Sequence, residues 1–269
     1  MTDSIGVLGC GWLGLPLGKK LLQNSHGIHG TTTSIQKLQT LQGEGICPYL
    51  ISLAAEGIEG DIQGFLSNID LLIVNVPPKM RSKNPESFLE KMKLLHAEIK
   101  KSKVQKVIFI SSTSVYGDIP GEVTETSLPK PVTESAIQLL ESENLFRLDN
   151  TLNTAVVRFG GLIGPTRHPV TILSGKKNLA NGNDPVNLIH LDDCIHLIST
   201  IIENQYWDEI FNGVYPFHPK KSEYYSDEAN KRDISPPHYT NEITQTLGKI
   251  VHSKNFLDKG HDFGTPINS

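Results

Sequence analysis

The sequence predicts an α/β fold of Rossmann type, in which a doubly wound parallel sheet carries a small C-terminal substrate lobe. Short apolar runs rich in β-branched residues alternate with helix-length amphipathic segments through the first two-thirds of the chain. This alternation is typical of a parallel sheet covered by helices on both faces. A glycine-rich segment, GCGWLG at residues 9–14, lies between the first apolar run and the first amphipathic segment. Together these observations favour a nucleotide-binding sheet.

In the first half of the chain, the patterns predict a strand at residues 4–8, a helix at 12–23 and a strand at 27–31. A weaker third strand follows Pro48 at residues 49–53, and a clear fourth strand spans 71–76. Asn84 is suited to cap a long helix that Pro85 opens and that ends near residue 101. The predicted buried stripe of this helix consists of Phe88, Met92, Leu95 and Ile99.

In the second half, a strand at 107–111, a loop to 132, a helix at 133–149 and a strand at 154–159 are expected. Beyond Gly160 the alternation of strand and helix patterns ends, and an apolar helix at 193–203 follows the run NLIHL. The chain after residue 204 is poorly periodic. We therefore expect a dinucleotide-binding domain at 1–165 and 186–204, continuous with a lobe at 166–185 and 205–269. Within the C-terminal segments we expect the aromatic side chains to form lobe core: Trp207, Tyr224 and Tyr225.

Composition excludes several classes of protein. With 25 basic and 29 acidic residues, the chain has a formal charge of −4, which argues against nucleic-acid binding. No apolar run reaches the roughly 18 residues of a membrane span, and no basic region precedes the first apolar stretch. The three cysteines lie far apart, and neither they nor the histidines have metal-ligand spacing. A cytoplasmic protein without a metal centre is expected.

The glycine segment predicts a dinucleotide site. Gly9 permits a tight turn, Gly11 lets the backbone approach a pyrophosphate, and Gly14 allows close packing of the helix. Trp12 and Leu13 complete the segment, where free N–H groups at the start of a helix attract an anion. The alternative is a glycine-rich turn that only packs.

NADP is the expected cofactor, with NAD as the alternative. The residues after the second strand contain no carboxylate that would bind the adenosine ribose of NAD. The hydroxyls of Thr31, Thr32 and Ser34 can donate to a 2′-phosphate, and Lys37 follows. No arginine is present there, and threonine and serine also form ordinary turns.

Other cleft residues follow from the position of strand ends. Ligands of such sheets bind at the carboxyl ends of the strands, so the loops after the later strands should line the cleft. Among these loop residues, four are predicted to contact the cofactor: Asn75, Pro77, Ser111 and Gly160. The candidates for the substrate side are Lys79, Arg81, Arg167 and His168, although basic loop residues are more often only solvated.

Four segments resemble the extended short-chain dehydrogenase/reductase family, which includes nucleoside-diphosphate-sugar epimerases and dehydratases. The segments are GCGWLG, FISSTSVYGD at 109–118, RFGGLIGPTR at 158–167 and NLIHLDDC at 187–194. The resemblance covers most of the chain. Within the family, the sequence is most similar to an atypical, epimerase-like branch. It implies a nucleotide-sugar as the small-molecule substrate, and a homodimer formed through the helices at 85–101 and 133–149.

The family uses a tyrosine as acid or base, a lysine four residues later and a serine or threonine that orients the substrate. Ser112 matches the orienting residue, and Pro131, Thr133 and Glu143 match the catalytic segment. In that segment, however, Ser135 replaces the tyrosine and Leu139 replaces the lysine.

This departure leaves two functions open. The first is an oxidoreductase or epimerase with a non-standard active site, for which the catalytic candidates are Ser112, Tyr116 and Ser135. His190 with Asp192 and Asp193 offers another proton path, although a hydrogen-bonded loop histidine and a helix N-cap are the simpler interpretation. The second is an inactive NADP-binding module that senses redox state or regulates a partner.

Overall fold

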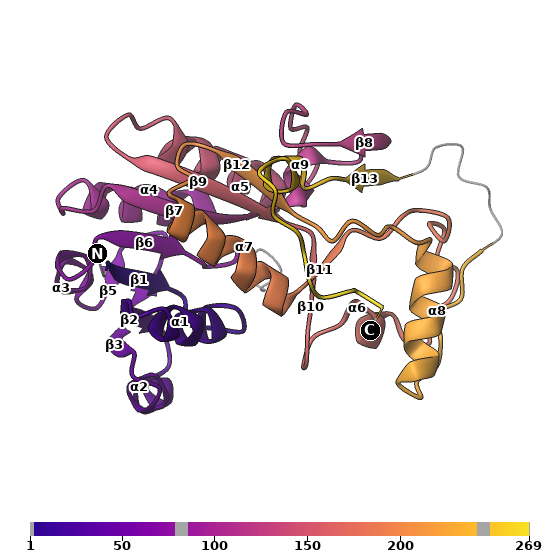
Figure 1. Cartoon of the computed structure of the whole chain (residues 1–269), viewed down its shortest axis with the longest axis horizontal. Helices are drawn as coiled ribbons and strands as arrows, with labels where there is room; N and C mark the ends of the chain where they lie inside the picture. Colours follow the sequence, from indigo (N-terminus) through magenta and orange to yellow (C-terminus); the bar gives the residue numbers. More distant parts are fainter. Residues whose placement is uncertain (1–2, 79–85, 241–247, 269) are drawn as a thin grey trace. The chain divides into compact units, whose positions relative to one another are not determined.

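The computed structural model describes residues 3–78, 86–240 and 248–268 (Figure 1). The chain forms two compact units. The first comprises Met1–Ser111, Thr133–Val157 and Ile198–Ile210, and the second comprises Ser112–Val132, Arg158–Leu197 and Phe211–Ser269. This division differs from the expected one chiefly because residues 112–132, 158–165 and 186–197 belong to the second unit.

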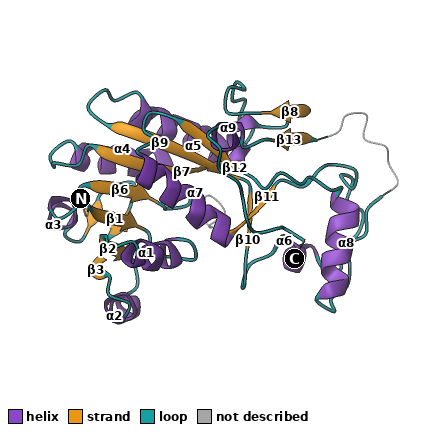
Figure 2. Ribbon diagram, viewed as in Figure 1, coloured by secondary structure: helices purple, strands orange, loops and turns teal. Residues whose placement is uncertain are grey.

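A seven-stranded sheet confirms the predicted fold class (Figure 2). The strand order is β12-β9-β7-β6-β1-β2-β3, and the pairs that join β3, β2, β1, β6 and β7 are parallel. The strands are β1 Ser4–Leu8, β2 Gly27–Thr32, β3 Cys47–Leu50, β6 Leu71–Val74, β7 Lys106–Ser112, β9 Asn153–Phe159 and β12 Ile210–Gly213.

The third and fourth predicted strands are shorter than expected. The segment predicted at 49–53 is divided between β3 and β4 Ser52–Leu53, and β4 pairs antiparallel with β5 Ile58–Glu59. The division occurs because the chain leaves β2 after Ile51, whose N–H donates to the carbonyl of Thr32. β6 ends at Val74, two residues before the predicted end.

The order of the strands reverses between β1 and β6. The chain adds β2 and β3 on one side of β1, then returns to place β6 and β7 on the other side. Gly9 follows β1 and Asn75 follows β6, so these two residues flank the reversal at the carboxyl ends of the strands. In open α/β sheets this is the position at which ligands bind.

The helices of the first unit are α1 Gly14–Gln23, α2 Ile35–Gly43, α3 Ile62–Ser67, α4 Phe88–Ile99 and α5 Glu134–Arg147. The predicted cap Asn84 and the predicted first residue Pro85 lie outside the described residues. The predicted start at residue 85 is wrong, because Glu86 and Ser87 are not helical and the hydroxyl of Ser87 accepts from the N–H of Glu90 at 3.3 Å. The predicted stripe of α4 is confirmed, since all four members are buried.

Helix α4 packs on α5, and Gln138 of α5 fixes the first turn of α4. Its side-chain oxygen accepts from the N–H groups of Phe88 at 2.6 Å and Leu89 at 3.3 Å. Its amide group donates to Glu134 at 2.6 Å. A buried glutamine thereby satisfies donors that a helix start leaves unpaired.

The second unit contains more regular structure than its sequence pattern predicts. It includes the 3₁₀ helix η1 Thr113–Tyr116, β8 Gly121–Val123, β10 Gly161–Ile163, α6 Pro169–Leu173, β11 Leu188–His190, α8 Lys221–Lys231, β13 Lys249–Val251 and α9 Lys254–Asp258. Most of these elements have three to five residues, too few for a periodic pattern. Helix α7, Leu191–Asn204, begins two residues before its predicted start.

Asp193 is not the N-cap of α7, because it lies in the first helical turn. Its carboxylate instead accepts from the N–H groups of Gly264 and Thr265, at distances of 2.9 to 3.2 Å. Within the second unit, this contact joins the C-terminal segment to the first turn of α7.

Tyr224 and Tyr225 are core residues of the second unit, as predicted, with 4% and 7% of their surface exposed. Trp207 of the first unit is only half-buried, and the ammonium of Lys106 lies 5.6 Å from its ring centre.

Beside Tyr224, the buried His168 accepts from the N–H of Val170 through Nδ1 at 3.2 Å. Its Nε2 therefore carries the proton and donates to the hydroxyl of Tyr224 at 3.0 Å, which in turn donates to the carbonyl of Ile267.

Acidification is expected to destabilise the protein through His168. Burial lowers the pKa of His168 to about 4, and Arg232 and Lys231 act in the same direction although the Glu228 carboxylate opposes them. The unfolded chain takes up this proton near pH 6.5 and the folded chain near pH 4. The contribution of His168 is therefore complete above pH 6.5 and is lost as the pH falls toward 4, by about 2–3 kcal/mol.

Urea unfolding at pH 7.5 and pH 4.5 would measure this difference. The His168→Gln variant should be less stable at pH 7.5 and should lose less stability between the two pH values. An equal loss in both proteins would show that His168 does not contribute to acid sensitivity.

Candidate functional site

The turn after β1 is fixed by hydrogen bonds to two neighbouring strands. The N–H of Gly9 donates to the hydroxyl of Thr31 at 2.9 Å, and the N–H of Cys10 donates to the carbonyl of Thr31 at 2.9 Å. From the other side, the amide group of Asn75 donates to the carbonyl of Gly9 at 3.0 Å. The glycine segment is thus held in one conformation between the ends of β2 and β6.

The three glycines of the segment have different surroundings. Gly9 has φ +105°, and a Cβ there would lie 2.5 Å from the carbonyl oxygen of Asn75. At Gly14 a Cβ would lie 2.2 Å from the carbonyl oxygen of Gly9. At Gly11 a Cβ would have no neighbour within 4 Å. The fold therefore requires glycine at positions 9 and 14, whereas position 11 faces open space.

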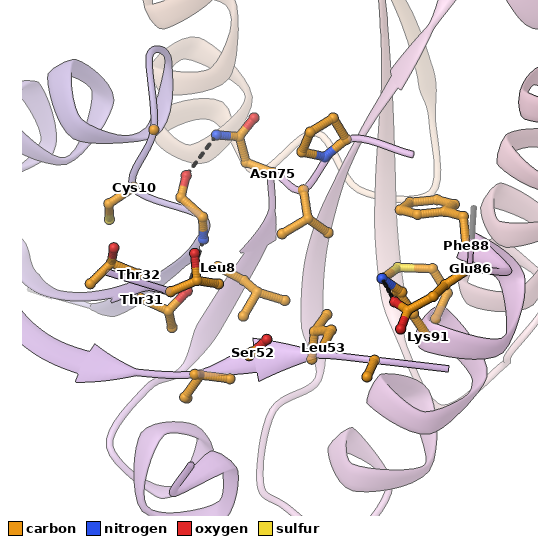
Figure 3. A pocket seen from close by; sticks show the side chains of 18 of the residues that line it. Leu8, Cys10, Thr31, Thr32, Ser52, Leu53, Asn75, Glu86, Phe88 and Lys91 are labelled. Carbon is orange, nitrogen blue, oxygen red and sulfur yellow. Dashed lines mark hydrogen bonds and ion pairs between the residues drawn. The ribbon is translucent and has the colours of Figure 1, made fainter. Parts of the chain in front are cut away.

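A cavity of about 670 Å³ opens in front of this segment, and the described residues that line it all belong to the first unit (Figure 3). Six of the predicted cofactor residues line it: Gly9, Gly11, Thr31, Thr32, Asn75 and Pro77. Trp12, Leu13, Gly14 and Ser34 do not line it.

Sequence reasoning missed much of the cavity wall. Residues 51–54 follow β3 and contribute to it, and the position of strand ends could have indicated them. Phe88 and Met92 were predicted only as core of α4, yet they also line the cavity. Thr33 was not singled out among the hydroxyls after β2, although it lines the cavity and is exposed.

The hydroxyls after β2 are partly engaged within the protein. Thr31 accepts from Gly9, and Thr32 accepts from the N–H of Ser34 at 3.1 Å. Ser34 donates to the side chain of Gln36 at 2.8 Å, away from the cavity lining. The threonine hydroxyls accept in these contacts, so their protons remain available to an anion. Lys37 adds a positive charge to the same wall.

Cys10 supplies no nucleophile to the cavity. Its thiol is buried and donates to the carbonyl of Val7 at 3.7 Å. Burial raises its pKa to about 12, so the thiol is neutral at physiological pH.

The structure places Tyr116 in the interior of the second unit. The side chain is fully buried, its hydroxyl donates to the side chain of Asn212 at 2.8 Å, and the guanidinium of Arg158 lies 4.9 Å from its ring centre. Burial raises the pKa of its phenol above the ordinary value. A general base requires a lowered pKa and access to substrate, so this geometry favours a packing role.

The serine candidates lie in less enclosed positions, and each is described within its own unit. In the second unit, Ser112 is half-buried and its hydroxyl accepts from the N–H of Ser114 at 3.1 Å. In the first unit, Ser135 is half-buried in the first turn of α5, one turn before the buried Leu139.

Two further predicted cofactor residues have contacts within the protein. The buried Ser111 donates a short hydrogen bond to the buried carboxylate of Glu143 in the first unit. In the second unit, the N–H of Gly160 donates to the carbonyl of Gly213 at 3.0 Å. A Cβ at Gly160 would lie 2.6 Å from the carbonyl oxygen of Asn187.

The structure describes only some of the candidate residues for the substrate side. Lys79 and Arg81 lie outside the described residues. Both ring nitrogens of His168 are engaged in the buried network of the second unit, so this histidine offers no free group to a substrate. His190 is the last residue of β11 and not a loop residue, but it is hydrogen-bonded as expected, since its Nδ1 accepts from the N–H of Asp192 at 3.2 Å.

Within the described residues, no group of three or more histidine, cysteine, aspartate or glutamate side chains has a geometry suited to a metal ion. In the same part of the chain, no helix combines the length and the hydropathy that crossing a membrane requires.

No protein-family model matches the sequence. Protein YeeZ of Escherichia coli strain K12 is 31% identical over 265 residues, which cover 97% of this chain and 96% of YeeZ. A protein of the same name from Escherichia coli O157:H7 is equally similar, at 31% identity over 265 residues.

Solved structures resemble the chain over nearly its full length. The UDP-glucose 4-epimerase of Thermotoga maritima, solved with UDP-glucose, matches with a TM-score of 0.79 and 17% identity, covering 98% of this chain and 95% of that chain. The UDP-glucuronic acid 4-epimerase of Bacillus cereus, solved with NAD, matches with a TM-score of 0.77 and 18% identity, covering 94% of this chain and 90% of that chain. The chain therefore has the fold of the nucleotide-sugar epimerases of the extended short-chain dehydrogenase/reductases.

Proposed function

Because the chain belongs to the family of protein YeeZ and has the fold of the extended short-chain dehydrogenase/reductases, we propose that it binds NADP(H) in the cavity of its first unit. The observation that carries the proposal is Gly11. It lines a cavity at the strand reversal, and neither its backbone angle nor a neighbouring atom requires glycine there. Open space at this position is what a pyrophosphate next to the backbone would need.

The 2′-phosphate of NADP is proposed to bind beside Thr32, Thr33 and Lys37. These residues line one wall of the cavity, and no carboxylate follows β2 to repel a phosphate. The hydroxyls supply donors and the ammonium supplies charge. NAD lacks the phosphate and gains nothing from Lys37.

The proposed activity is that of an oxidoreductase or epimerase with a non-standard active site. The bound nicotinamide would supply hydride transfer. Ser112 would orient a substrate hydroxyl, and Ser135 would lie where the family has its tyrosine. The proposed substrate is a nucleotide-sugar, since the epimerase of Thermotoga maritima was solved with UDP-glucose. A cytoplasmic homodimer formed through α4 and α5 completes the proposal.

The alternative is an inactive NADP-binding module that reports redox state to a partner. Leu139 favours it, because this side chain is only 3% exposed and cannot lower the pKa of a neighbouring hydroxyl as lysine does. The burial of Tyr116 removes the most acidic of the candidate hydroxyls. Transfer of deuterium from labelled NADPH to a nucleotide-sugar would support the enzyme. Its absence, together with unequal affinities for NADPH and NADP, would support the module.

Titration with NADPH and with NADH, followed by tryptophan fluorescence, tests the cofactor proposal. Trp12 lies in the glycine segment, and Trp207 is the other tryptophan, so the Trp12→Phe variant identifies the signal. We expect saturable quenching, with NADPH bound about tenfold more tightly than NADH. The Lys37→Met variant should lose about tenfold in affinity for NADPH and little for NADH.

Three results would each contradict a part of the cofactor proposal. Equal affinities for NADPH and NADH would contradict the phosphate site. An unchanged NADPH affinity in the Lys37→Met variant would show that Lys37 is not part of the phosphate site. Folded protein that binds neither nucleotide would contradict the proposed function as a whole.

A further inference from the structure

The end of the cavity that is distant from the glycine segment is formed by the start of α4. Figure 3 shows Glu86, Phe88 and Lys91 on one side of the cavity and Cys10, Thr31 and Thr32 on the other. The ammonium of Lys91 forms an ion pair with the carboxylate of Glu86. The Lys91 side chain is 20% exposed and the Glu86 side chain is 50% exposed. A paired donor and acceptor therefore line this end of the cavity.

The wall between the two ends is largely apolar. Ser52 and Leu53 lie along one side in Figure 3, and Asn75 lies on the other. Most of the side chains that line this middle section carry no polar atom: Ile51, Leu53, Ala54, Val76 and Pro77. Apolar walls with a few placed polar groups are typical of small-molecule and cofactor sites.

The backbone next to the ion pair is anchored to α5. Lys91 belongs to the first turn of α4, and Glu86 precedes the N-cap Ser87 by one residue. Gln138 anchors this turn by accepting from Phe88 and Leu89, and the hydroxyl of Ser87 donates to the same oxygen at 3.4 Å. The order of acceptor and donor along this end of the cavity is consequently defined.

The ion pair also reduces electrostatic repulsion between the Glu86 carboxylate and a bound phosphate. A lone carboxylate in a cavity for a dinucleotide would repel the phosphates. Glu86 is the only acidic side chain among the described residues of the lining, and Lys91 neutralises it, while Lys37 leaves the lining with a positive charge. With its charge neutralised, the Glu86 carboxylate can accept a hydrogen bond from a neutral donor at this end of the cavity.

We propose that Glu86 and Lys91 recognise the hydrogen-bonding edge of the adenine base. The carboxylate of Glu86 accepts from the exocyclic N6 amino group, and the ammonium of Lys91 donates to N1. Hypoxanthine reverses both groups, with a carbonyl oxygen at position 6 and N–H at position 1. The fixed order of the pair therefore discriminates between the two bases. This assignment rests on the proposed function, because it requires that a dinucleotide binds in the cavity.

The test compares NADPH with reduced nicotinamide hypoxanthine dinucleotide phosphate, which differs only in the base. We expect the unmodified protein to bind NADPH about tenfold or more tightly than the hypoxanthine analogue. The Glu86→Gln and Lys91→Met double variant should bind both with affinities that differ by less than about threefold. A matched control is the Glu90→Gln and Lys93→Met double variant. It removes an exposed pair with 2.8 Å between its atoms on the same helix, outside the cavity lining.

The outcomes separate this inference from the proposed function. Binding of both nucleotides with equal affinity by the unmodified protein overturns the assignment and leaves the dinucleotide site intact. Discrimination that survives in the Glu86 and Lys91 variant, or that disappears in the control variant, also overturns it. Failure to bind either nucleotide overturns the proposed function itself. Discrimination that is lost only in the Glu86 and Lys91 variant supports the assignment.

Discussion

Replacing Gly11 by alanine is expected to weaken NADPH binding about a hundredfold while the free energy of unfolding changes by less than about 0.5 kcal/mol. The added methyl group meets no protein atom within 4 Å, and the backbone of Gly11 does not have the positive φ that disfavours alanine. The methyl group would instead occupy the space proposed for the pyrophosphate. Fluorescence titration measures the first quantity and urea unfolding measures the second.

Alanine substitutions at two other glycines serve as controls for the Gly11→Ala variant. At Gly9, alanine should destabilise the protein by about 1–3 kcal/mol, because φ is +105° and the Cβ would lie 2.5 Å from Asn75. At Gly57, which like Gly11 has open space around it but lies outside the cavity lining, alanine should change neither quantity. Normal NADPH affinity in the Gly11→Ala variant would mean that the nucleotide does not approach this backbone.

Restoring the family lysine through Leu139→Lys is expected to destabilise the protein by about 3 kcal/mol. Leu139 is 3% exposed on the buried side of α5, and an ammonium there would lose its hydration. The buried carboxylate of Glu143, one turn further along the helix, already accepts from Ser111. For a chain of this size the melting temperature should fall by about 6–12 °C. Thermal unfolding followed by circular dichroism at pH 7.5 would measure the change.

Leu139→Met provides the control, because it conserves volume and should cost less than about 1.5 kcal/mol. If Leu139→Lys proved as stable as Leu139→Met, an anion or solvent would have to reach this position. The predicted cost of burying a charge at position 139 would then be wrong, whereas the argument for the inactive module, which rests on the leucine itself, would be unchanged.

The sequence predicted the framework well because long periodic segments dominate it. The strand at residues 4–8 was predicted with the observed bounds, and the buried stripe of α4 was predicted completely. The end of the third strand and the start of α4 were not predicted correctly. They depend on contacts such as those of Ser87 and Thr32, which periodicity does not reveal. The C-terminal elements were missed because they are short.

The site was predicted in part, for a similar reason. Gly9, Gly11, Asn75 and Pro77 could be assigned because they follow strands of the sheet within three residues. Ser34 was predicted to contact the cofactor and Thr33 was not, although both side chains carry a hydroxyl. Which of the two neighbouring side chains faces the cavity depends on how the chain enters α2. Glu86 and Lys91 carry no signal in the sequence, since their placement requires the packing of α4 on α5.

The contact between Gln138 and the first turn of α4 has a consequence for cooperativity. No described residue of α5 lines the cavity, yet α5 supplies the acceptor for the amides of Phe88 and Leu89. Local unfolding of α5 would expose both amides to solvent exchange and release the turn that carries Lys91. We therefore expect the lifetime of one cavity wall to depend on a neighbouring helix, with α4 and α5 opening as a single cooperative unit.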